Sequence, residues 1–209
     1  MKSLILPVAL AAGLLSSAPL QAQESPCKES PWMVRLRAVS LQPANQSDAA
    51  SGLPADAIHV SSKTIPEVDV SYFFTKHVAA ELVLTVPQEH DVTLSGTKIG
   101  TFKELPPTLT AQWHFLPGQT VDPYVGLGLN LTLISDVKLA GGALDLDKTS
   151  VGLAAQVGVD FKVARNCFIN LDVKYVQIQS DVKVAATGAK VTTVKVDPML
   201  YGVGVGYRF

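Results

Sequence analysis

The sequence contains 209 residues with a formal net charge of −1, and 47% of them are hydrophobic while 17% are charged. A chain of this length supports one domain of modest size rather than two. The near-neutral charge excludes a broad basic surface for nucleic acid, and the apolar content excludes an intrinsically disordered chain.

The N-terminus predicts a secretory signal peptide over residues 1–22. Lys2 provides a positive charge, an apolar segment follows from Leu4 to Leu15, and small residues precede the expected cleavage after Ala22. The apolar segment has about twelve residues, well short of the ~20 that a membrane-spanning helix needs. We therefore expect an exported protein whose single domain covers residues 23–209.

Eight segments of this domain alternate apolar with polar or small residues, which is the period of a β-strand. Each is close to the ~10 residues that a tilted strand needs to cross a bilayer. In chain order the predicted strands are 32–41, 65–74, 78–86, 108–115, 125–133, 151–161, 169–175 and 199–209. Long polar connections (42–63, 87–104, 135–149 and 179–197) alternate with short ones (75–77, 116–123 and 163–166).

This order is typical of a closed antiparallel barrel with four loops at one end (the loop end) and three turns plus both termini at the other (the turn end). One face of the strands has too many glycines and charges to form a core. On the other face, aromatic residues gather at the turn end, as in an interfacial girdle. These aromatic residues are Trp32, Tyr72, Phe74, Trp113, Phe115, Phe161, Tyr207 and Phe209.

We therefore predict an all-β fold: an eight-stranded antiparallel up-and-down transmembrane β-barrel in the bacterial outer membrane, with both termini periplasmic. Its apolar side chains face lipid and its polar side chains fill the lumen. A soluble barrel with an apolar interior shows the same alternation and is the alternative.

The inward-facing residues predict two levels in the lumen. Eight strands leave just enough room for side chains, so paired charges toward the turn end should form a plug. Toward the loop end the lining becomes apolar and suits a small hydrophobic guest, although Glu67 departs from this pattern and the lining could be a simple hydrophobic cap. The predicted charged floor is Arg35, Arg37, Asp69, Glu81, Asp160, Asp172, Lys174 and Arg208, and the predicted apolar lining is Val39, Leu41, Ile65, Val83, Ile134, Val176, Ile178 and Leu200.

Three prolines lie at the loop end of a single predicted hairpin. Pro87 ends the third strand, and Pro106 and Pro107 begin the fourth. Because proline donates no ladder hydrogen bond, these residues predict a lateral opening through which apolar molecules leave the lumen. The alternative is that they merely end two strands at a loop.

Five motifs give the chain a resemblance to a known family, the OmpW family of small outer-membrane proteins. They are Leu-Pro-Pro-Thr-Leu-Thr-Ala-Gln-Trp at 105–113, Asp-Pro-Tyr-Val-Gly at 122–126, Ala-Gln-Val-Gly-Val-Asp at 155–160, Val-Asp-Pro-Met at 196–199 and Gly-Tyr-Arg-Phe at 206–209. The resemblance implies an eight-stranded barrel with a narrow channel that lets small hydrophobic molecules cross the outer membrane. It also favours the lateral opening, and the final strand is of the kind that the outer-membrane assembly machinery reads.

The expected partners are thus outer-membrane lipid, small hydrophobic solutes and the assembly machinery, without nucleic acid or a cofactor. Two other functions stay open: a structural or partner-binding barrel that transports nothing, and a lipid-modifying enzyme. The enzyme would need residues such as His59, Ser61, Ser62 and Asp91, and the sequence favours no catalytic activity. Residues 89–91 (Glu-His-Asp) are expected in a solvated loop rather than a metal site.

Two cysteines remain after the predicted cleavage. Cys27 precedes the first strand and Cys167 begins the seventh, so both fall at the turn end. A disulfide between them is geometrically possible if the N-terminal segment folds back, but the sequence leaves the pairing open.

Overall fold

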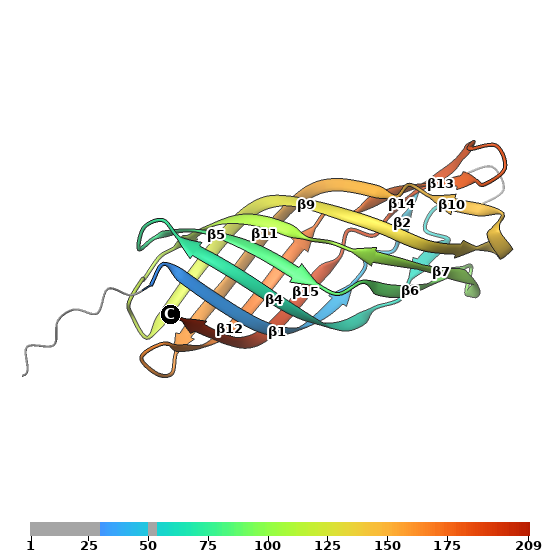
Figure 1. Ribbon diagram of the computed structural model, residues 1–209. Helices are drawn as coiled ribbons and strands as arrows, with labels where there is room; N and C mark the ends of the chain where they lie inside the picture. Colours follow the sequence, from blue (N-terminus) through green and yellow to red (C-terminus); the bar gives the residue numbers. More distant parts are fainter. Residues whose placement is uncertain (1–29, 50–53) are drawn as a thin grey trace, which may run out of the picture.

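Eight long strands form a closed antiparallel barrel in the computed structural model, which describes residues 30–49 and 54–209 (Figure 1). Each strand pairs with its neighbours, and the last one pairs with the first to close the ring. The predicted all-β, eight-stranded fold is confirmed. In chain order the strands are β1 (Trp32–Gln42), β4 (Lys63–Phe73), β5 (Val78–Thr85), β8 (Thr108–His114), β9 (Val121–Leu139), β11 (Thr149–Lys162), β12 (Cys167–Val176) and β15 (Met199–Arg208).

The predicted signal peptide over residues 1–22 and Cys27 lie outside the described residues. Cys167 is exposed at the first residue of β12. The disulfide therefore stays a prediction.

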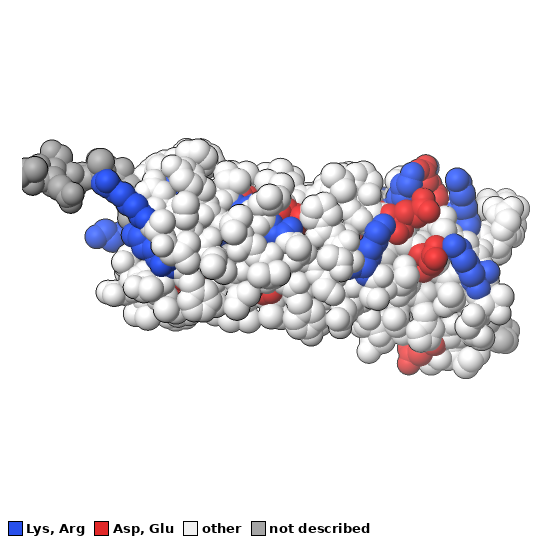
Figure 2. Space-filling view, turned by 90° about the horizontal axis from the view of Figure 1, so that it is seen from below, with Lys and Arg blue, Asp and Glu red and all other residues white. Residues whose placement is uncertain are grey.

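The outer wall of the barrel is apolar. Leu127 and Val151 are each 72% exposed on it. At the turn end the aromatic rings contact one another edge to face, with centroids 4.8 Å apart for Trp32 and Tyr72 and 5.1 Å apart for Tyr207 and Phe209. Figure 2 shows a central belt with few charged atoms, whereas charged side chains gather at the loop end. An apolar belt of this kind is suited to contact with membrane lipid.

None of the described residues forms a helix that is long and apolar enough to cross a membrane.

The long connections were predicted as polar loops, and this was wrong. They contain further strands that continue the wall beyond the loop end, and these strands, together with the last residues of β9 (Ser135–Leu139), are called the extension here (Figure 1). Strand β7 pairs with β9 from Gly100↔Leu139 to Leu105↔Leu133. The extension strands are β2 (Gln46–Ser47), β3 (Ile58–Val60), β6 (Gln88–Leu94), β7 (Thr97–Leu105), β10 (Leu144–Leu146), β13 (Gln179–Val184) and β14 (Lys190–Lys195), with a short 3₁₀ turn at Ala140–Gly142.

The extension reverses the polarity of the alternation. In β6 the outward residues Glu89 and Asp91 are exposed and charged, while Val92 is buried inside. Water rather than lipid surrounds such a wall, so polar residues face out and the interior is mainly apolar, with His90 and Glu104 as buried exceptions. The period of two is the same in both parts, and only the surroundings differ.

Glycines make room for large side chains in the narrow lumen. Tyr124 is fully buried, and its register partner on β11 is Gly158. A Cβ atom on Gly158 would lie 2.4 Å from Cζ of the Tyr124 ring. At Gly202, by contrast, the nearest atom would be Cδ of Arg37 at 3.4 Å, an ordinary contact.

We therefore expect Gly158→Ala to lower the free energy of unfolding by roughly 2 kcal/mol, the usual cost of overpacking. Denaturant unfolding of the protein in lipid vesicles measures this change. Gly202→Ala is the matched control and should cost much less. Equal losses in the two variants would contradict the account of Tyr124 packing.

Candidate functional site

The lumen has three levels along the barrel axis. A network of buried ion pairs, called the charged floor, lies toward the turn end. A mixed cavity, the lower chamber, lies above it, and an apolar cavity, the upper chamber, lies inside the extension.

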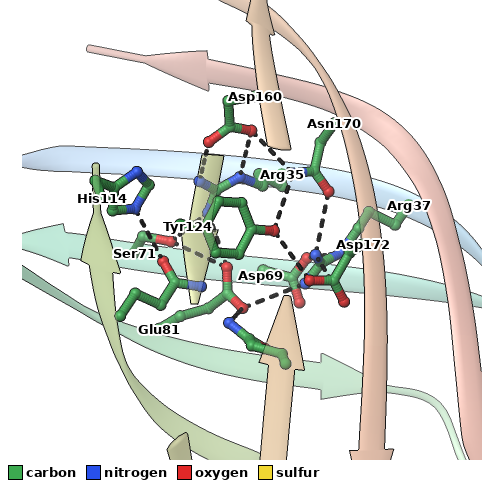
Figure 3. A network of polar contacts seen from close by, with 12 residues as sticks. Arg35, Arg37, Asp69, Ser71, Glu81, His114, Tyr124, Asp160, Asn170 and Asp172 are labelled. Atoms are coloured by element: carbon green, nitrogen blue, oxygen red, sulfur yellow. Dashed lines mark hydrogen bonds and ion pairs between the residues drawn. The ribbon is translucent and has the colours of Figure 1, made fainter. Parts of the chain in front are cut away.

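Arg35 forms the lower half of the charged floor (Figure 3). Its Nη2 lies 2.6 Å from Oδ2 of Asp160 and its Nε donates to Oδ1 of the same carboxylate at 3.2 Å. Its Nη1 donates to Glu81 at 2.8 Å and to Ser71 at 2.7 Å. This two-point pairing holds a fully buried guanidinium in place.

Arg37 forms the upper half and joins four carboxylates. Its Nε lies 2.6 Å from Asp69 and 3.0 Å from Glu67, and its other nitrogens lie 3.3 Å from Glu81 and 3.5 Å from Asp172. Glu67, the exception in the sequence pattern, is thus part of the floor. Its carboxylate also accepts a hydrogen bond from Lys174 at 3.2 Å.

Tyr124 completes the floor and was missed in the sequence. Its hydroxyl donates to Asp172 at 3.0 Å and accepts from Asn170 at 3.0 Å, and Arg35 lies 5.5 Å from its ring centroid. Tyr124 is separated from the inward-facing Gly126 and Gly128 of β9 by an even number of residues, so its side chain points to the same face. This spacing could have placed Tyr124 in the lumen from the sequence alone. Its side chain is fully buried in the lumen beside Arg35.

Arg208, which was predicted in the floor, lies nearer the turn end, together with His114. Arg208 stacks on the ring of Phe73, with 4.1 Å from Cζ to the centroid, and its Nε donates to the carbonyl of Ser30. Nδ1 of His114 pairs with Asp122 at 2.9 Å. These contacts support the floor from below.

The lower chamber combines an apolar wall with a polar bottom. Most of the predicted apolar lining lies in this wall, whereas Ile134 lies higher, in the upper chamber, and Val39 packs in the surrounding core. Glu67 and Lys174 reach the chamber from the charged floor below. Its lining is Leu41, Ile65, Glu67, Val83, Thr85, Pro106, Thr108, Lys174, Val176, Ile178, Pro198 and Leu200.

The upper chamber is lined almost entirely by apolar side chains. Its empty space is about 480 Å³, a volume that includes the open side of the chamber. Sequence analysis missed it because its strands were read as loops. Its lining is Ile58, Val60, Val92, Ile99, Phe102, Ile134, Leu139, Leu144, Leu146, Ser180, Val182, Val194 and Val196.

The barrel wall changes at the prolines. Strands β5 and β8 pair from Val78↔Trp113 to Val83↔Thr108, and pairing across this hairpin resumes only at Gln88↔Glu104 of β6 and β7. The side-chain amide of Asn130 donates to the carbonyls of Pro106 and Pro107, each at 3.2 Å. The carbonyl of Pro107 also accepts the backbone N–H of Leu131 at 3.0 Å, so β9 holds the proline segment on its side. Pro87 is exposed just beyond the end of β5.

His90 lies inside the extension, so the prediction that residues 89–91 form a solvated loop was wrong. It belongs to β6, is fully buried and stacks on Phe102 with 5.7 Å between centroids. Its Nδ1 donates to the carbonyl of Ser61 at 2.9 Å. Its Nε2 lies 3.3 Å from Oε1 of Glu104, which is within ion-pair distance, but the two atoms do not form a hydrogen bond. Within residues 30–49 and 54–209 no group of side chains could hold a metal ion.

The residues considered for catalysis form no relay. Oγ of Ser61 accepts from the backbone N–H of Asp91 at 3.1 Å, and His59 and Ser62 are exposed.

The charge of His90 should stabilise the extension at low pH. Burial lowers the pKa of His90, but Glu104 and the Ser61 carbonyl outweigh burial and raise it above the ordinary 6.5. The stabilisation is therefore complete below pH 6.5 and is lost as the pH rises through the raised pKa. NMR titration of the His90 ring should show a pKa above 6.5, and Glu104→Gln should lower it. Glu89→Gln, on the outer face, should leave it unchanged; an unaltered pKa in Glu104→Gln would contradict the assignment.

Known proteins resemble this chain along its whole described length. A sequence model of the OmpW family matches residues 28–209. The uncharacterized outer-membrane protein y4mB of Sinorhizobium fredii is 38% identical over 185 residues, covering 86% of this chain and 80% of that protein. Outer membrane protein W of Vibrio cholerae is 33% identical over 223 residues, covering 100% of both chains.

Solved structures show the same architecture. The crystal structure of OprG from Pseudomonas aeruginosa superposes with a TM-score of 0.74 at 28% identity, covering 87% of this chain and 97% of that one. The solid-state NMR structure of AlkL in lipid bilayers superposes with a TM-score of 0.68 at 21% identity, covering 99% and 97%, a likeness of fold alone. With its closed barrel and apolar belt, this chain is a bacterial outer-membrane protein and belongs to the OmpW family.

Proposed function

We propose that this protein conducts small hydrophobic molecules across the outer membrane, entering at the loop end. The observation that carries the proposal is the apolar upper chamber, which stands above a lower chamber with apolar walls. A guest that buries about 100 Å² of apolar surface there gains roughly 2.5 kcal/mol.

The orientation in the membrane follows from the extension. Its polar outer face suits the water outside the cell. Because β1 begins and β15 ends at the opposite end of the barrel, this orientation favours both termini in the periplasm.

A guest cannot continue straight through the charged floor. Arg35, Glu81 and Tyr124 fill the lumen below the lower chamber and are fully buried. Moving a guest past them would break ion pairs inside the barrel, and each separated pair would leave an uncompensated buried charge. The path therefore has to leave the lumen above this level.

The exit that we propose is a lateral opening at Pro87, Pro106 and Pro107. Pro106 lines the lower chamber, and the β5–β8 ladder ends at Val83↔Thr108 beside it. Separating the wall here breaks few backbone hydrogen bonds, because proline contributes no donor. Hydrophobic molecules would pass from the lower chamber into the membrane.

A charge placed in the upper chamber should stop transport. Val194→Asp puts a carboxylate among apolar side chains, so uptake of a labelled alkane by intact expressing cells should fall at least tenfold. Ala186→Asp adds the same charge to an exposed turn of the extension and should leave uptake unchanged. Normal uptake by Val194→Asp at equal surface expression would favour a structural barrel without transport.

Closing the wall should also stop transport. Replacing Pro87, Pro106 and Pro107 together by valine supplies the missing donors, and alkane uptake should fall several-fold at equal surface expression. Pro123→Val, in the part of β9 near the turn end, is the control. Unchanged uptake by the triple variant would refute the lateral exit while leaving the upper chamber as the entry site.

A further inference from the structure

The bottom of the lower chamber has a polar pair with unused hydrogen-bonding capacity. Glu67 and Lys174 both line the chamber, and both are buried. Their neighbours in the wall above are apolar, including Leu41, Ile65 and Val83. Any molecule that fills the chamber therefore has its lower end against this pair.

Lys174 offers donors to a guest. An ammonium group has three N–H donors. In the part of the chain that the structure describes, Lys174 donates a single hydrogen bond, to Oε1 of Glu67 at 3.2 Å. Buried donors without a partner are costly, so an acceptor that a guest brings to Lys174 would be bound well.

Glu67 offers an acceptor beside them. Both of its ion pairs are made through Oε1, with Arg37 at 3.0 Å and Lys174 at 3.2 Å. Among the described residues, Oε2 of Glu67 receives no hydrogen bond. A free acceptor and free donors thus lie on one ion pair at the end of an apolar cavity.

The charges around this pair select a neutral end group. Five carboxylates and three cations interact in the floor, so an anionic end group would meet an excess of negative charge; they are Glu67, Asp69, Glu81, Asp160 and Asp172 with Arg35, Arg37 and Lys174. The same excess attracts a cation, but a cationic end group would have to lie beside the Lys174 ammonium and compete with it for Glu67, the carboxylate of the chamber lining. A hydroxyl is neutral and can both donate and accept.

Resting on the proposed function, we propose that the lower chamber recognises the terminal hydroxyl of a primary alkanol. The hydroxyl donates to Oε2 of Glu67 and accepts from Nζ of Lys174, while the alkyl chain lies along the apolar wall toward the upper chamber. Glu67 and Lys174 are then specificity-determining residues of a channel that also admits alkanes.

The test compares uptake of labelled decane and 1-decanol by intact cells that express the chain. The double variant Glu67→Gln with Lys174→Met removes one charge of each sign, and Arg37 keeps Asp69 at 2.6 Å. We expect the ratio of 1-decanol uptake to decane uptake to fall about tenfold, the loss of a hydrogen bond to a charged group. The matched control Asp147→Asn with Lys183→Met neutralises a surface ion pair of the extension and should change neither rate.

The outcomes separate this inference from the proposed function. If the double variant keeps the wild-type ratio of 1-decanol to decane uptake, or loses both rates together, alkanol recognition is overturned and decane transport by the wild type still stands. If wild-type expression accelerates neither solute, the proposed function itself fails.

A second measurement needs no variant. In cells with the unaltered protein, the half-saturating concentration for uptake of 1-decanol should be about tenfold lower than that of its methyl ether, which lacks the O–H donor. Equal concentrations would overturn the inference even if the double variant did not fold.

Discussion

The structure depends on the rule that no backbone hydrogen-bonding group can stay unpaired in lipid. A sheet that crosses the membrane must therefore close on itself, and eight strands close around a lumen that side chains fill. Because lipid takes the apolar face, charged residues in the membrane part of these strands, such as Arg35, Glu81 and Asp172, turn inward and need partners. Arg35 between Asp160 and Glu81 meets that need, and the same ion pairs close the lumen to a straight path.

Beyond the membrane the surroundings change from lipid to water, and the interior has the opposite polarity. Water surrounds the extension, so Glu89 and Asp91 face out and Val92 faces in. The lumen consequently changes from charged to apolar along a single axis, without any change in the strand period. The apolar upper chamber thus follows from where lipid stops, and this gradient is what makes transport of hydrophobic molecules physically reasonable.

The sequence predicts the membrane part well because the outward-facing residues of its strands are consistently apolar. Parity also assigns Arg35, Glu81 and Asp172 to the lumen, but it cannot show that Glu67 belongs with Arg37 and Lys174, since those partners lie on other strands. The extension was missed for a physical reason. Its strands are short, and their outward-facing residues are polar, whereas the predicted strands were recognised by apolar residues that face lipid. Val182 and Val194 carry the inverted pattern, which is visible once water is taken as the surroundings.

The central claim is that apolar molecules occupy the lumen above the charged floor and do not pass through it. An experimental structure of the protein in lipid with 1-bromodecane tests this claim most directly, because anomalous scattering locates the bromine. We predict bromine in the upper or lower chamber, with none between the floor and the turn end. Bromine at the turn end below Arg35, or chambers that stay empty at saturation, would contradict the account.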